Sequence, residues 1–182
     1  MDRLTALIRD CIRGGRASQN RLYHQLAPKM FGVCLRYAKN KEEAEEIMQE
    51  AFVQVFKSLP AFRFMGSFEG WVRKIMVYCA IKHYRSRPKM APYLSLDIAI
   101  NDKYGAEDIT TQLHQKELLK MVQALPPGYR MVFNLYVFEG MLHREIAAHL
   151  GISEGTSKSN LYDAKILLQK AFANSLKIAG NY

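Results

Sequence analysis

A chain of 182 residues has room for one domain or two small ones, and a hydrophobic content of 49% is enough for packed cores. Aromatic residues at 11% and charged residues at 24% argue against wholesale disorder. The net charge of +9 favours a polyanionic partner such as nucleic acid, although many small proteins are basic for no specific reason.

The charge is distributed unevenly along the chain. Two basic blocks, of net charge +8 over residues 1–87 and +3 over residues 112–182, flank an acidic segment of net charge −2 at residues 88–111. That segment also carries two prolines and a glycine, which break regular structure. We therefore expect two domains, residues 1–87 and 112–182, on a flexible linker at residues 88–111.

The cysteines and the N-terminus indicate the compartment. Cys11, Cys34 and Cys79 are far apart, odd in number and without the spacing of a metal site, so we expect reduced thiols in or near the core. The N-terminus lacks the long apolar stretch of a signal peptide, and no apolar run is long enough to cross a membrane. These features predict a cytoplasmic protein without a metal or other cofactor.

The first block predicts four helices. Apolar residues at helical spacing indicate helices at residues 3–13, 17–38 and 68–86, and Asn40 is a good cap for another that ends at Leu59-Pro60. Pro28 is expected to kink or divide the second helix. The core face of the third is formed by Ala44, Ile47, Met48, Ala51, Phe52 and Val55.

The second block predicts four more helices and a known motif. Helices are expected at residues 112–124 and 128–138, the second of them started by Pro126-Pro127. From Leu142 to Leu161 the chain reads LHREIAAHLGISEGTSKSNL, in which a short helix stops at Gly151 and Ser153 caps the next, which is expected to reach about Phe172. This pattern is typical of a helix-turn-helix, so the sequence predicts an all-α fold of two small helical domains.

The second helix of such a motif usually lies in the DNA major groove. Glu154, Lys158, Tyr162 and Lys165 share its outward face, while Leu161, Ala164, Leu168 and Ala171 face inward. Ser157 is unusual, because such motifs commonly bury Val or Ile there. An ordinary solvated face is the alternative interpretation. The candidate DNA-reading residues are Arg144, Ser153, Glu154, Thr156, Lys158, Ser159, Tyr162 and Lys165.

A second candidate site combines the 61–67 loop with the 68–86 helix. Cations and aromatic rings alternate there, which suits single-stranded nucleic acid because rings stack on bases while Lys and Arg follow phosphates. A lone Trp is more often a core anchor than a stacking surface, so we expect the body of Trp71 to pack in the core, and His83 is expected to be a packed or surface histidine rather than a ligand. The candidate residues are Arg63, Phe64, Ser67, Trp71, Lys74, Tyr78, Lys82 and Arg85.

A third candidate site lies on the 41–58 helix, away from its core face. Glu46, Gln49, Glu50 and Val53 form a protein-docking surface or a set of solvated side chains. Catalysis finds little support, because no Gly-rich phosphate loop, HExxH or GxSxG motif occurs.

Three segments in this order resemble a bacterial RNA polymerase sigma factor of the extracytoplasmic-function (ECF) type. The chain is similar to family region 2.2 and the following specificity loop at AEEIMQEAFVQVFKSLPAFR, to regions 2.3 and 2.4 at FEGWVRKIMVYCAIKHYRSR, and to region 4 from Leu125 to Leu168. A lone helix-turn-helix is weak support for a family, whereas the ordered set is specific.

The resemblance implies a division of labour between the two domains. The first would bind the polymerase clamp helices through Glu46, Gln49, Glu50 and Val53. It would also open the promoter −10 element with the 61–67 loop and the 68–86 helix. The second would read the −35 element as duplex and contact the polymerase flap. An anti-sigma factor is an expected partner, no small-molecule substrate is implied, and the protein would be no enzyme.

Three further points follow from the resemblance. The acidic linker residues Asp97, Asp102, Glu107 and Asp108 would imitate the transcript in the polymerase cleft, unless the segment is a plain tether. Tyr78 stands where the family usually has Asn, so its base contact is not carried over. Asn160 and Ser157 replace the commoner Arg and Val, so the family's −35 sequence preference is not carried over to this chain.

Two other functions remain open on the sequence alone. A stand-alone helix-turn-helix regulator would bind duplex DNA without polymerase. A single-strand or RNA-binding protein would use only the surface at residues 61–87.

Overall fold

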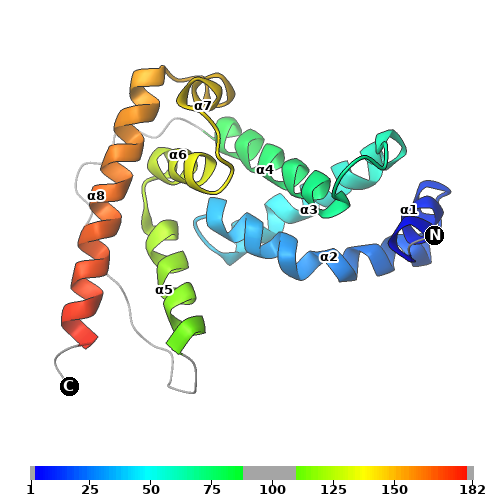
Figure 1. Cartoon of the computed structure of the whole chain (residues 1–182), viewed down its shortest axis with the longest axis horizontal. Helices are drawn as coiled ribbons and strands as arrows, with labels where there is room; N and C mark the ends of the chain where they lie inside the picture. The colour runs from blue at the N-terminus through cyan, green and yellow to red at the C-terminus, as the bar shows by residue number, and fades with distance from the viewer. Residues whose placement is uncertain (1–2, 88–109, 180–182) are drawn as a thin grey trace. The chain divides into compact units, whose positions relative to one another are not determined.

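The structure is a computed structural model that describes residues 3–87 and 110–179 (Figure 1). Every regular element in these two ranges is a helix, which confirms the all-α fold expected from the sequence. The chain divides into two compact units, Met1–Tyr84 and Arg85–Tyr182. Of the expected linker only Thr110 and Thr111 are described, and they already belong to a helix; Asp97, Asp102, Glu107 and Asp108 lie outside the described residues.

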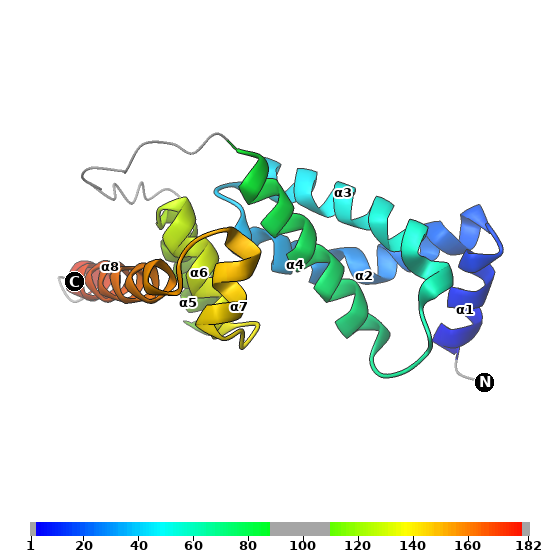
Figure 2. The same cartoon turned by 90° about the horizontal axis from the view of Figure 1, so that it is seen from above.

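The first unit contains α1 (Arg3–Ile12), α2 (Arg16–Tyr37), α3 (Lys41–Ser58), the short 3₁₀ turn η1 (Leu59–Ala61) and most of α4 (Phe68–Ser86) (Figures 1 and 2). α2 and α3 pack along one another, and α1 packs on α2 and on η1. Pro28 does not divide α2, which runs unbroken through it. The fully buried side chains come from α1, α2, α3, η1 and α4 and include Ile8, Leu22, Met30, Ile47, Val55, Leu59, Val72 and Met76.

Local capping explains where α3 begins. Asn40 Oδ1 accepts a hydrogen bond from the Glu43 backbone N–H at 2.9 Å, and the Glu43 carboxylate accepts one from the Lys39 N–H at 2.9 Å. Glu43 is only 6% exposed, and its other carboxylate oxygen lies 3.4 Å from Nε2 of the half-buried His83. The start of α3 is therefore tied to α4, and His83 is a packed histidine.

The second unit contains α5 (Thr110–Ala124), α6 (Pro127–Val137), α7 (His143–Leu150) and α8 (Glu154–Ala179). α8 packs on α5, α6 and α7, and the core includes Val132, Leu135, Ile146 and Ala164. Asn134 and Arg130 are also buried, and the Asn134 amide donates to the Arg130 carbonyl one turn earlier.

The helix-turn-helix has the turn that the sequence predicts. Gly151 ends α7 in the left-handed conformation (φ 68°) that favours glycine, and its N–H reaches the Ala147 carbonyl at 2.9 Å. Ser153 then caps α8 by accepting from the Thr156 N–H at 2.9 Å. α8 ends at Ala179 rather than near Phe172, because the sequence holds no helix breaker before Gly180. No helix in the described part of the chain is both long and apolar enough to span a bilayer.

Candidate nucleic-acid interface

An aromatic cluster anchors the 61–67 loop to the start of α4. Phe62 is buried, and its ring centroid lies 5.0 Å from Phe68, 5.1 Å from Phe64 and 5.2 Å from Trp71. The Phe68 and Trp71 rings are stacked at 5.7 Å. Trp71 is half-buried and packs against Phe62 and Phe68, as a core anchor does.

The loop that leaves this cluster exposes its remaining side chains. Phe64 is 41% exposed and Met65 is 79% exposed. Arg63, between the buried Phe62 and the exposed Phe64, is exposed as well. Ser67 is also exposed, but its Oγ accepts from the Gly70 N–H at 3.1 Å and so caps α4. The sequence analysis did not name Met65 as a site residue. The available signal was a methionine within the loop, between Phe64 and Gly66.

Four residues of α4 form a continuous exposed row, which we call the α4 stripe. Tyr78 is 60% exposed, and the cations beside it are exposed as well. These side chains lie opposite the buried Val72, Met76 and Cys79, as helical spacing requires. The row of positive charge with an aromatic ring suits a nucleic-acid backbone. Its members are Lys74, Tyr78, Lys82 and Arg85.

The candidate docking face of α3 is exposed, as the sequence indicated. Its members, Glu46, Gln49, Glu50 and Val53, all lie at the surface. Val53 is 54% exposed, so it offers apolar area at the surface. The opposite side of α3 supplies the core.

The three thiols lie inside the first unit. Cys11, Cys34 and Cys79 are buried and free, as expected. Burial, with a smaller contribution from Cys79, raises the pKa of the Cys34 thiol to about 12. Burial also raises the pKa values of Cys11 and Cys79. These thiols are packing groups.

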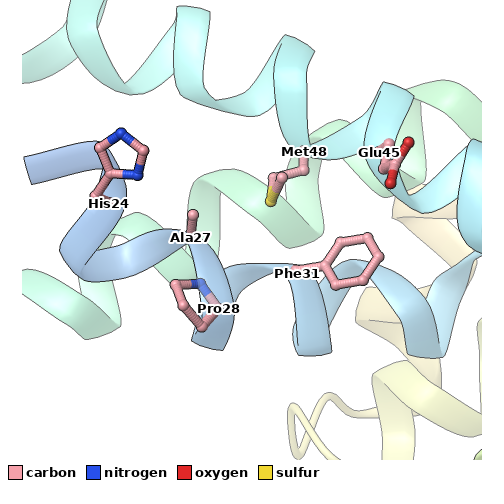
Figure 3. A pocket seen from close by; sticks show the side chains of 6 residues that line it. All are labelled: His24, Ala27, Pro28, Phe31, Glu45 and Met48. Atoms are coloured by element: carbon pink, nitrogen blue, oxygen red, sulfur yellow. The ribbon is translucent and has the colours of Figure 1, made fainter. Parts of the chain in front are cut away.

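A hollow of about 290 Å³ opens between α2 and α3 (Figure 3). Ala27, Pro28, Phe31 and Met48 supply most of its lining, and His24 and Glu45 lie at opposite ends of the row. The hollow therefore brings no acid–base pair together.

The outward face of α8, here called the α8 stripe, consists of Glu154, Lys158, Tyr162 and Lys165, all exposed. Tyr162 is 66% exposed. Glu154 and Lys158 form an ion pair at 2.9 Å, and the hydrogen bond from Lys158 lowers the pKa of Glu154. Arg144 on α7 is exposed too.

Three of the hydroxyl groups expected near DNA have partners within α8. Ser153 Oγ lies 2.8 Å from Thr156 Oγ1 besides capping the helix, and Ser159 Oγ donates to the Thr156 carbonyl at 3.1 Å. These groups therefore stabilise the first turn of α8.

A polar clamp joins α7 to α8. Ser157 is fully buried, and its Oγ lies 2.9 Å from Nδ1 of His143. The His143 ring stacks on Tyr136 of α6 at 4.8 Å, and the Lys165 ammonium lies 6.0 Å from the centre of the Tyr136 ring. Sequence reasoning missed His143. The signal was Ser157 itself, because a serine at a buried position needs a hydrogen-bond partner.

Comparison with known proteins gives the family. A model described as "Sigma-70 region 2" matches residues 22–89, and one described as "Sigma-70, region 4" matches residues 115–168. The RNA polymerase sigma-H factor of Pseudomonas aeruginosa is 26% identical over 92% of this chain and 92% of its own. The ECF RNA polymerase sigma factor SigE of Mycolicibacterium smegmatis is 30% identical over 86% of this chain, which spans 62% of that relative.

Among solved structures, the chain is similar to the sigma factor RpoE in complex with the anti-sigma factor NepR from Bartonella quintana. The sequence identity is 18% and the TM-score is 0.49, over 85% of this chain and 96% of that one. The two family models cover both compact units in chain order, and curated relatives carry the ECF name. The chain belongs to the sigma-70 family of RNA polymerase sigma factors, as a member of the extracytoplasmic-function type.

Proposed function

We propose that this chain binds the core of RNA polymerase, directs it to specific promoters in the cytoplasm and catalyses no reaction itself. One observation carries the proposal. Each compact unit exposes a cationic helix face, the α4 stripe or the α8 stripe, and each face lies within the residues matched by one of the two sigma-70 models.

The first unit would open the −10 element. Strand opening needs a surface for unstacked bases beside cations that hold the phosphates. The 61–67 loop offers the exposed Phe64 and Met65, and Arg63 lies next to them. The α4 stripe supplies Lys74 and Lys82 for the single strand. Residues 1–87 are accordingly assigned to sigma region 2.

The second unit would read the −35 element as duplex. A helix in the major groove needs an exposed, rigid face, and α8 is held by Ser153 at its start and by the polar clamp at its first turns. Lys158 and Lys165 would neutralise phosphates, while Tyr162 and Glu154 would reach base edges. Residues 112–182 are assigned to sigma region 4, with residues 88–111 as the linker.

The docking face of α3 would contact the polymerase clamp helices. Val53 supplies exposed apolar area, and Glu46 and Glu50 place negative charge beside it, so a basic surface with an apolar centre is complementary. The second unit would contact the flap. An anti-sigma factor is the expected inhibitor.

In vitro transcription tests the proposal directly. Purified chain and core polymerase are incubated with a genomic promoter library, and the transcripts are sequenced. We expect a defined subset of start sites that core alone does not use, with shared elements near −10 and −35. Transcripts indistinguishable from those of core alone would refute the proposal.

The family assignment disfavours a stand-alone regulator, and a binding assay separates the two functions. A promoter duplex taken from that library should bind the chain poorly alone and tightly after core is added. Equal affinity with and without core would favour the regulator.

A further inference from the structure

We propose that α1 acts as a brace for the 61–67 loop, with Arg9 as the positioning residue that holds Phe64. α1 lies outside the residues matched by the sigma-70 region 2 model, which begin at residue 22. The inference rests on the proposed function for its consequence, base selection at the promoter, while its structural part stands alone.

Phe64 adopts a backbone conformation that residues other than glycine rarely adopt. Its φ is 57°, the only positive value at a non-glycine residue in the described part of the chain. A bulky side chain in this left-handed region is strained, because its Cβ lies too close to the following carbonyl oxygen. Gly66 follows with φ 81°, so two of three consecutive residues have positive φ, and only the glycine adopts it without strain. Such a loop keeps its shape only where its surroundings hold it.

Two groups hold the Phe64 ring. The centroid of the Phe62 ring lies 5.1 Å from that of Phe64, and the Arg9 guanidinium lies over the Phe64 ring, 5.6 Å from its centre. That distance is within the range of a cation–π contact. Phe64 is nevertheless 41% exposed, so the contact fixes the ring while leaving part of it open to a base.

The position of Arg9 is itself well determined. Its neighbour Ile8 is 2% exposed and Cys11 is 3% exposed, which anchors α1 on the first unit. α1 packs on α2 and on η1, the turn that leads into the loop. At the end of α1, Gln19 Nε2 donates to the Cys11 carbonyl, and the Gly15 N–H donates to the Asp10 carbonyl at 3.1 Å. The brace therefore runs from the core through α1 to the loop.

Two readouts on the full-length chain test the brace. The first is amide hydrogen exchange of the 61–67 loop in wild type, Arg9→Ala, Arg9→Lys and Arg13→Ala. Arg13 is the matched control, because it carries the same charge just beyond α1 and pairs with Asp10 instead of the loop. We expect loop exchange to be about two- to fivefold faster in Arg9→Ala, the size of an exposed cation–π contact, with Arg9→Lys in between and Arg13→Ala unchanged.

The second readout is base selection. Holoenzyme made with each variant is mixed with a pool of single-stranded 12-mers of random sequence, and the retained strands are sequenced. Wild type should enrich a base at one position, Arg9→Ala should lose about two- to fivefold of that enrichment with unchanged core binding, and Arg9→Lys should recover part of it.

The outcomes separate the two proposals. Exchange that is the same in Arg9→Ala and Arg13→Ala overturns the brace, whatever the holoenzyme does. Faster exchange in Arg9→Ala with unaltered enrichment overturns its role in base selection. A wild-type holoenzyme that enriches no base refutes the proposed function instead, and the exchange result still decides whether the brace exists.

Discussion

Ser157 on α8 and His143 on α7 are joined by a hydrogen bond of 2.9 Å in the interior of the helix-turn-helix. Ser157 is fully buried, so its hydroxyl depends on this partner. The bond crosses from the first turn of α7 to the first turn of α8, and the Tyr136 ring stacks on the histidine ring. A polar contact therefore joins the two helices at a position where such motifs commonly bury an apolar side chain, in addition to their apolar packing.

Replacing His143 by alanine should destabilise the second unit. The change leaves the Ser157 hydroxyl buried without its partner and removes the stack on Tyr136, so we expect a loss of about 1–3 kcal/mol in the free energy of unfolding. Urea denaturation measured by circular dichroism gives this value. His149→Ala is the control, because His149 is exposed on the same helix. Equal stability of the two variants would show that the clamp contributes nothing.

The polar clamp shows how much of this site could be predicted from the sequence. The spacing of Gly151 and Ser153 predicts the turn and the cap, because both are local chemistry that three or four residues decide. The sequence also marked Ser157 as unusual. It did not point to His143, because that contact spans 14 residues and depends on the angle between two helices. The stripes on α4 and α8 follow from helical spacing alone, whereas the Arg9–Phe64 contact joins segments whose proximity no pattern encodes.

The lysines of the α8 stripe should contribute to duplex binding mainly through charge. Lys158→Ala and Lys165→Ala should each weaken binding of holoenzyme to promoter duplex, and each should reduce the slope of log affinity against log salt by about 1. A filter-binding or anisotropy titration at several salt concentrations measures both quantities. Lys170→Ala, on the same helix and exposed, should leave the slope unaltered. If all three variants behave alike, the stripe is an ordinary solvated face.

The α4 stripe should act at strand opening more than at duplex binding. A Lys74→Ala and Lys82→Ala double variant removes two charges from the proposed single-strand path, so we expect weaker permanganate reactivity of thymines near −10 with nearly normal closed-complex formation. The control is Arg16→Ala with Arg21→Ala, which removes the same charge from exposed positions of α2. A wild-type permanganate pattern in the Lys74 and Lys82 variant would contradict the assignment.

The buried thiol of Cys34 should make the stability of the first unit sensitive to alkali. Its pKa of about 12 lies above the value of 9.0 expected for an unburied thiol, so the folded state favours the protonated form. The stabilisation is complete below about pH 9 and is lost as the pH rises from there toward 12. Urea midpoints are measured from pH 8 to pH 11. Both proteins should lose stability over this range, and the midpoint of Cys34→Ala should fall less steeply than that of wild type. Parallel curves for the two proteins would show that the thiol contributes nothing to the decline.

Reversing one charge on the docking face should weaken binding to the polymerase core. Glu50 lies one helical turn from the exposed Val53 and Glu46, so Glu50→Lys places a positive charge at the centre of an acidic face without touching the core of the unit. A like charge opposite a basic partner costs both the lost attraction and the new repulsion, so we expect the dissociation constant for core polymerase to rise about tenfold or more. Fluorescence anisotropy of labelled chain with core enzyme measures this dissociation constant.

Asp10→Lys makes the same charge reversal on α1, where the carboxylate pairs with Arg13 at the surface, and should bind core as the wild type does. An unchanged dissociation constant for Glu50→Lys would move the docking surface away from α3, and equal losses in both variants would reduce the effect to net charge.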